Sequence, residues 1–123
     1  MGLGVFEKIL IDERPDYVVV FGDTNATLSG ALASAKLGVP VAHIEAGLRS
    51  HNRKMPEEIN RIVVDRISHK LFCPNTESAK NLQKENCFGE IHCVGDIMVD
   101  QIYHIRKIGF SQRVVPEEPF VFI

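Results

Sequence analysis

Acidic and basic side chains gather in the stretch VAHIEAGLRSHNRKMPEEINR, residues 41–61. Glu45 follows a short apolar run, Glu57 follows a proline, and Arg61 comes one helical turn after Glu57. Upstream, Asp23 follows another apolar run. Carboxylates can take up and return a proton, and a nearby guanidinium can bind an anion. The pattern therefore suggests acid–base chemistry on an anionic substrate.

Each of these side chains also has a purely structural explanation. Asp23 can help to cap the helix that follows it, and Glu57 can complement its helix dipole or pair with Arg61. Glu45 is harder to explain in this way, because a carboxylate beside a buried strand must be paired or functional. His43, inside the same strand, is more often a satisfied core histidine than a catalytic one.

Composition and charge limit the class of protein. The 123 residues can form one domain, and 45% hydrophobic with 24% charged residues is ordinary for a soluble globular chain. A net charge of −2 argues against nucleic-acid or membrane partners, and no apolar run reaches transmembrane length. Three cysteines without a C-x-x-C motif suggest free thiols in the cytoplasm, and no metal or cofactor is expected.

The hydrophobic pattern predicts alternating helices and strands. Strands are expected at 17–21, 41–44, 70–73 and 91–94, and helices at about 2–13, from Thr24 or Asn25 to Gly38, from Pro56, from Thr76 to about 86, and after Asp96. This alternation favours a doubly wound parallel α/β sheet, in which ligands bind at the carboxyl ends of the strands. Asp23 and Glu45 would share one crevice if their strands are neighbours, with Glu57 on the same rim.

Two longer segments resemble a known family. Residues 15–75, from PDYVVVFGDTN to FCPN, closely resemble the non-hydrolysing UDP-N-acetylglucosamine 2-epimerases, and IHCVGDIMVD at 91–100 resembles a further segment of them. HIEAGLRS followed by MPEEINR at this separation is the most specific part of the match. The resemblance implies a Rossmann-like N-terminal half-domain of the GT-B type. It also implies interconversion of UDP-N-acetylglucosamine and UDP-N-acetylmannosamine by elimination and re-addition of UDP, a UDP-sugar partner and a homo-oligomer.

The resemblance also implies roles for individual residues. Asp23 in GDT, Glu45 in HIEAGLR and Glu57 in PEE match the catalytically important acids of the family. Arg61 matches an arginine at the substrate, and Arg49 is a weaker anchor or a residue that orders the loop. Together these groups would move the proton at C2 of the sugar and stabilise the departing diphosphate.

The match to the family is partial. The phosphate loop that opens the family's N-terminal domain and the histidine motif of its second domain have no counterpart here. We therefore expect residues 1–108 to form a partial Rossmann-like domain, 109–119 a linker and 120–123 the start of a second domain, in a chain that is inactive alone. Two other classes remain open: a non-catalytic sugar-nucleotide-binding module, and part of a GT-B glycosyltransferase, against which PEEINR argues.

Overall fold

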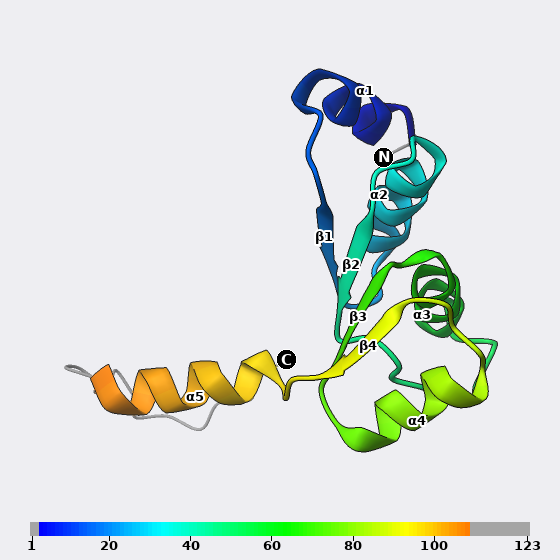
Figure 1. The fold of residues 1–123 in the computed structure, drawn as a ribbon. Coiled ribbons are helices and arrows are strands. Elements are labelled where there is room, and N and C mark those ends of the chain that lie inside the picture. The colour runs from blue at the N-terminus through cyan, green and yellow to red at the C-terminus, as the bar shows by residue number, and fades with distance from the viewer. Residues whose placement is uncertain (1–2, 109–123) are drawn as a thin grey trace, which may run out of the picture.

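The computed structural model describes residues 3–108, in which five helices alternate with four strands (Figure 1). The helices are α1 (Leu3–Glu13), α2 (Asn25–Lys36), α3 (Pro56–Ile67), α4 (Thr76–Lys84) and α5 (Ile97–Ile108). The strands are β1 (Val18–Phe21), β2 (Val41–Ile44), β3 (Lys70–Cys73) and β4 (Glu90–Cys93). The linker expected at 109–119 and the segment expected at 120–123 lie outside the described residues.

The four strands form one parallel sheet in the order β1-β2-β3-β4. Strands that follow one another in the chain are thus neighbours in the sheet, and right-handed crossovers then place the connecting helices on one face. Figure 1 shows α2, α3 and α4 on that face, with α1 beside α2. The predicted parallel α/β class is confirmed, and β1 and β2 are neighbours, as the shared crevice requires.

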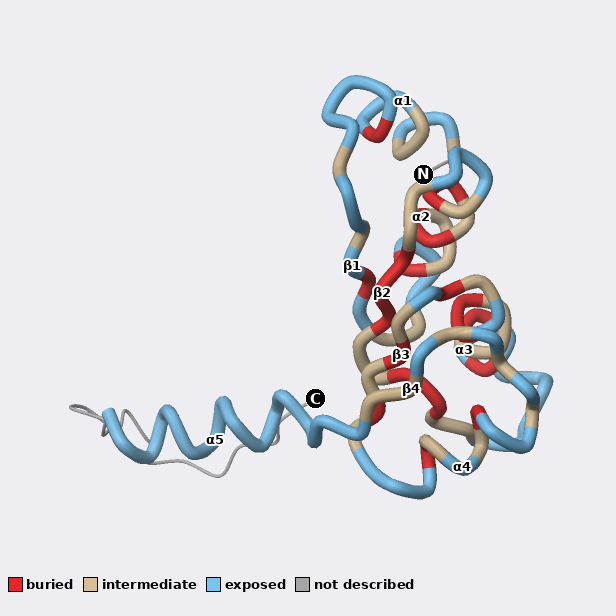
Figure 2. Tube along the Cα trace, in the orientation of Figure 1, coloured by how far each residue is buried: buried red, intermediate tan, exposed pale blue. Residues whose placement is uncertain are grey.

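The opposite face of the sheet has no helical cover in the described part of the chain. Val19 and Phe21 point to this face and are 52% and 53% exposed. The α5 helix leaves the end of the sheet and has no buried residue (Figures 1 and 2). Residues 3–108 therefore contain one helical layer of a doubly wound sheet.

Two apolar clusters fill the space between the sheet and its helices. They consist of Val20, Ala31, Val41 and Val64, and of Ala46, Leu71, Cys73 and Leu82. Alternate residues of a strand face opposite sides, so Val20 is buried while Val19 is exposed. Full burial of a side chain such as Leu71 contributes roughly 1.5–3 kcal/mol. This core fixes the positions of the strand ends.

Side-chain caps decide where most of the helices begin. Three predicted starts are confirmed: Thr24 caps α2, Pro56 opens α3, and the Asp96 carboxylate accepts a hydrogen bond at the start of α5. The prediction is wrong for α4, where Asn75 and not Thr76 is the cap. Asn75 is extended, and its Oδ1 accepts from the backbone N–H of Ser78 at 2.9 Å, which makes Thr76 the first helical residue.

Candidate functional site

The carboxyl ends of β1 and β2 place Asp23 and Glu45 at one edge of the sheet. Phe21 pairs with Ile44, and the N–H of Gly22 donates to the Ile44 carbonyl at 3.1 Å. The chain then turns at Gly22 and Glu45, whose φ angles of 62° and 70° are both left-handed. A Cβ on Gly22 would lie 3.5 Å from Glu45 Oε2, so the Glu45 carboxylate lies beside the turn that carries Asp23.

Arg61 connects the Asp23 turn to α3. Its guanidinium pairs with the Asp23 carboxylate and lies 3.5 Å from Glu58 Oε2. Asn60 adds a second connection, because its side-chain amide donates to the Asp23 carbonyl at 2.7 Å. The structural explanation of Glu57 as the partner of Arg61 is wrong, since the fold brings Asp23 within reach of the guanidinium. The start of α3 is thereby held against the end of β1.

The two adjacent glutamates at the start of α3 have different surroundings. Glu57 is exposed and lines, together with Asp23, a hollow between the starts of α2 and α3. Glu58 is 2% exposed and accepts hydrogen bonds from the N–H groups of Ser50 at 2.9 Å and His51 at 3.0 Å. Burial would raise the pKa of Glu58, but these hydrogen bonds lower it below its ordinary value. Glu58 therefore orders the loop, while Glu57 is accessible to a ligand.

Arg49 lies in a buried ion network and not at this hollow. Its side chain is 1% exposed, and its guanidinium pairs with Asp65 at 2.8 Å and with Glu85 at 2.7 Å. Burial would lower the pKa of Arg49, but the bonds to both carboxylates and their charges raise it, so Arg49 stays charged. This placement favours the loop-ordering role of Arg49 over the substrate-anchoring one.

Asp65 is the centre of that network and was not found by sequence reasoning. Its Oδ1 lies 2.7 Å from His43 Nδ1, and its Oδ2 accepts from the N–H of Gly47 at 3.1 Å. His43 is fully buried with both ring nitrogens bonded, as expected for a satisfied core histidine. The available signal for Asp65 was an acidic residue inside the apolar run of α3, because a buried charge requires a partner.

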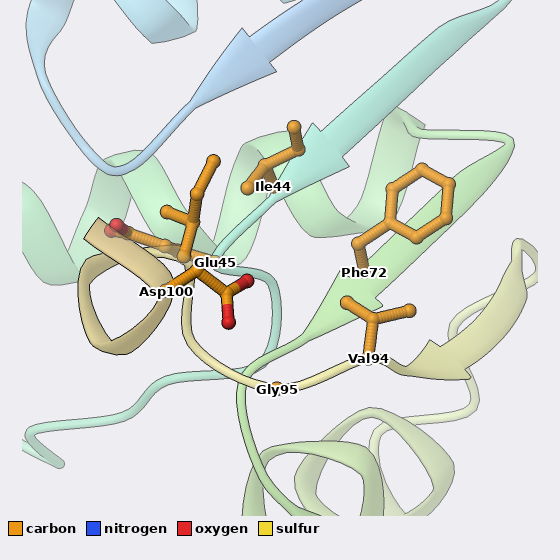
Figure 3. A pocket seen from close by; sticks show the side chains of 7 residues that line it. Ile44, Glu45, Phe72, Val94, Gly95 and Asp100 are labelled. Carbon is orange, nitrogen blue, oxygen red and sulfur yellow. The ribbon is translucent and has the colours of Figure 1, made fainter. Parts of the chain in front are cut away.

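A second hollow lies on the open face of the sheet, next to Glu45 (Figure 3). It is lined by two carboxyl side chains and several apolar ones, among them Glu45, Asp100, Ile44, Phe72 and Val94. Glu45 lines this hollow, whereas Asp23 and Glu57 line the one between α2 and α3. The structure thus brings the three acids to the same end of the sheet but divides them between two hollows that share no lining residue.

Residues 3–108 also show the state of the cysteines, the spacing of possible metal ligands and the length of the helices. Among residues 3–108, no group of His, Cys, Asp and Glu is arranged to hold a metal ion. Cys73, Cys87 and Cys93 are free thiols, of which Cys73 is buried. None of the helices in this part is both long and apolar enough to cross a membrane.

Comparisons with known proteins agree on one family. The family model described as UDP-N-acetylglucosamine 2-epimerase matches residues 1–122. A UDP-N-acetylglucosamine 2-epimerase of Methanococcus maripaludis is 53% identical over 110 residues, which are 89% of this chain and 30% of that protein. The UDP-2,3-diacetamido-2,3-dideoxy-D-glucuronate 2-epimerase of Pseudomonas aeruginosa is 54% identical over 110 residues, 87% of this chain and 30% of that protein.

Solved structures show the same fold. The UDP-GlcNAc 2-epimerase of Methanocaldococcus jannaschii, in complex with UDP-GlcNAc and UDP, matches with a TM-score of 0.83 and 50% identity. This match covers 86% of the present chain and 30% of that one. The Neisseria meningitidis enzyme bound to UDP-GlcNAc matches with a TM-score of 0.79 and 34% identity, over 83% of this chain and 29% of that one. The chain thus spans about 30% of the length of the relatives it matches.

Proposed function

Because this chain belongs to the UDP-N-acetylglucosamine 2-epimerase family, we propose that it is part of an enzyme that epimerises C2 of a UDP-linked acetamido sugar. The chain spans about 30% of its relatives, so the activity is proposed for the complete enzyme. The observation that carries this proposal is the pairing of Arg61 with Asp23 at the edge of the sheet where Glu45 and Glu57 also lie.

The proposed reaction is elimination and re-addition of UDP. The C2–H bond breaks, the proton goes to a carboxylate, and the electron pair forms a C1=C2 double bond while UDP leaves with the electrons of the C1–O bond. Re-addition of UDP at C1 and of a proton on the opposite face of C2 gives the epimer. This sequence needs carboxylates that accept and return a proton, and a cation near the leaving diphosphate.

We assign the proton transfers to Asp23, Glu45 and Glu57, and the binding of the anionic substrate to Arg61. The side chains of Arg61 and Asp23 are 19% and 26% exposed, so a ligand can reach both. A proton that leaves one face of C2 and returns on the other needs acids on both sides of the carbon, and Asp23 and Glu45 follow neighbouring strands of the sheet. Arg49 has the supporting role of ordering the loop after Glu45.

A second candidate substrate is UDP-2,3-diacetamido-2,3-dideoxyglucuronate. The relative from P. aeruginosa that is named for this substrate is 54% identical to the chain, against 53% for the M. maripaludis UDP-N-acetylglucosamine epimerase. Both substrates share the UDP group and an acetamido group at C2, so the same acids and Arg61 serve either one. Epimerase assays of the complete enzyme with each of the two UDP-sugars would show which one is the substrate.

We also propose a cytoplasmic homo-oligomer. The free thiols of Cys73, Cys87 and Cys93 suit a reducing compartment. In the described part of the chain β1 lies at the edge of the sheet, and unpaired backbone groups on an edge strand can pair with another chain. Sedimentation should therefore show a dimer or larger species at tens of micromolar, and a stable monomer would contradict the proposal.

The test of the enzymatic proposal is a chimera in which this chain replaces the matching segment of the M. maripaludis epimerase. We expect deuterium from heavy water at C2 of UDP-N-acetylglucosamine and appearance of the manno epimer. Asp23→Asn should slow both by about 10²–10⁴, whereas Glu77→Gln, at an exposed position of α4, should leave both unchanged. A folded chimera that binds UDP without exchange at C2 would instead favour a non-catalytic binding module. Turnover that requires an acceptor would favour a glycosyltransferase.

A further inference from the structure

His43 lies between two groups that accept hydrogen bonds. Its Nε2 is 2.8 Å from the carbonyl oxygen of Gly22, and its Nδ1 is 2.7 Å from Oδ1 of Asp65. A carbonyl has no proton to donate, so Nε2 must carry one. A neutral ring would then present the Nδ1 lone pair to a carboxylate at hydrogen-bond distance, which is repulsive. One additional proton must therefore lie between Nδ1 and Oδ1.

The other bonds of Asp65 place this proton on the ring. Its Oδ2 accepts from the N–H of Gly47 at 3.1 Å and from the guanidinium of Arg49 at 2.8 Å. Hydrogen bonds and a positive charge at this oxygen stabilise the carboxylate over the carboxylic acid. We propose that His43 is held as an imidazolium by the Asp65 carboxylate, and that this pair positions the turns that carry Asp23 and Glu45.

The charges around the pair balance when His43 is protonated. The cluster then contains two cations, His43 and Arg49, and two anions, the buried Asp65 and the partly exposed Glu85. Burial raises the pKa of the nearby Cys73 thiol to about 11 and also raises that of Cys87, so these thiols add no charge. Buried charges are tolerated when they are paired and hydrogen-bonded, and a protonated His43 gives the buried Asp65 carboxylate a second cationic partner beside Arg49.

The pair connects the two turns that carry candidate catalytic carboxylates. His43 holds the backbone carbonyl immediately before Asp23, and Asp65 holds a backbone N–H that follows Glu45. Glu45 itself has a φ of 70°, which needs support from its neighbours. His43 and Asp65 are thus positioning residues for Asp23 and Glu45. This role rests on the proposed function, whereas the protonation of His43 does not.

The test is NMR of the full 123-residue chain at neutral pH, labelled with nitrogen-15 in its histidine rings and with carbon-13 in its aspartate carboxyl groups. We expect both ring nitrogens of His43 to carry protons that exchange slowly with water, because the side chain is fully buried. In Asp65→Asn the side-chain amide can donate to Nδ1, so this variant should keep the Nε2 proton and lose the Nδ1 proton. A wild-type Nδ1 without a proton overturns the proposal, as does a carboxyl carbon signal showing Asp65 as the acid.

These wild-type measurements need no variant, so they decide the protonation even if Asp65→Asn does not fold. The positioning role has its own measurement, which is amide hydrogen exchange. Exchange at Gly47 should be about tenfold faster in Asp65→Asn, because the charge-assisted bond from its N–H is weakened, while the amides of β3 should be unchanged. Equal acceleration at Gly47 and in β3 would show general destabilisation and overturn the positioning role. Neither measurement involves turnover, so neither depends on the proposed epimerase activity.

Discussion

Arg61, near the start of α3, pairs with the carboxylate of Asp23, which follows β1. Both side chains remain partly exposed, and an ion pair of this kind contributes only about 0–1 kcal/mol to stability. Stability alone therefore gives a weak reason for holding an acid and a cation together at the edge of a hollow. A ligand with an anionic group can reach both side chains, which are 19% and 26% exposed.

Asp23→Asn should separate catalysis from stability. In the chimera described above, we expect kcat to fall by about 10²–10⁴, the usual contribution of a general acid or base. Urea unfolding of the 123-residue chain should change by no more than about 1 kcal/mol, because the pair is partly exposed. Deuterium exchange at C2 gives the rate. A loss of less than tenfold would assign Asp23 a structural role only.

Replacement of Glu45 by glycine should raise the stability of the chain and lower the activity of the enzyme. Its left-handed φ of 70° costs a non-glycine residue about 1–2 kcal/mol, so Glu45→Gly should stabilise the chain by about 0.5–1 kcal/mol in urea unfolding. Glu45→Gln keeps the strain and should leave stability unchanged. Both variants of the chimera should lose several orders of magnitude in turnover. A marked loss of stability in Glu45→Gly would point to a structural carboxylate.

Gly47 and Gly38 form a matched pair for testing close packing of the loop after Glu45. Both have left-handed φ angles, 81° and 75°. A Cβ on Gly47 would lie 2.3 Å from the carbonyl oxygen of Ser78, whereas a Cβ on Gly38 would meet nothing within 4 Å. Gly38→Ala should cost about 1–2 kcal/mol from backbone strain alone, and Gly47→Ala about 1–3 kcal/mol more. Equal losses of unfolding free energy in the two variants would show that the loop moves to make room for the added methyl group at little cost.

Glu58 should make the folded chain sensitive to acid. Its pKa is below the ordinary value in the folded state, so its contribution to stability is complete above the ordinary glutamate range and is lost as pH falls through the folded pKa. Thermal unfolding at neutral and acidic pH should therefore differ less in Glu58→Gln than in the wild type. Glu57→Gln, next to it and exposed, is the control and should behave as the wild type does. If the thermal stability of Glu58→Gln depended on pH as strongly as that of the wild type, this would contradict the lowered pKa of Glu58.

The isolated 123-residue chain should not epimerise UDP-N-acetylglucosamine. Orientation of the reacting groups contributes roughly 7–11 kcal/mol to catalysis, and the chain spans only about 30% of its relatives. Deuterium incorporation at C2 should stay at the level of a blank without protein. Clear turnover by the pure chain, abolished in Asp23→Asn, would show that these residues suffice. Activity that appears only when the remaining segments of a relative are added would show that the two parts form the active site together.

Local patterns in the sequence determined the elements of this protein. The VVVF run makes a strand, Thr24 caps α2, Gly38 ends it, and Pro56 opens α3. Each of these features depends on residues within a few positions of one another, so the sequence alone is enough to read them. Strand and helix alternation likewise predicts the parallel sheet, and the HIEAGLRS and MPEEINR motifs identified the family.

The pairing of the charged residues follows from the packing of helices on the sheet and not from local sequence. Arg61 pairs with Asp23 and not with Glu57, and Arg49 is buried against Asp65 and Glu85. The partner of a charge depends on how the helices pack on the sheet, and packing joins residues that are far apart in the chain. For the same reason His43 and Asp65 became a pair only when β2 and α3 came together, which no local pattern specifies.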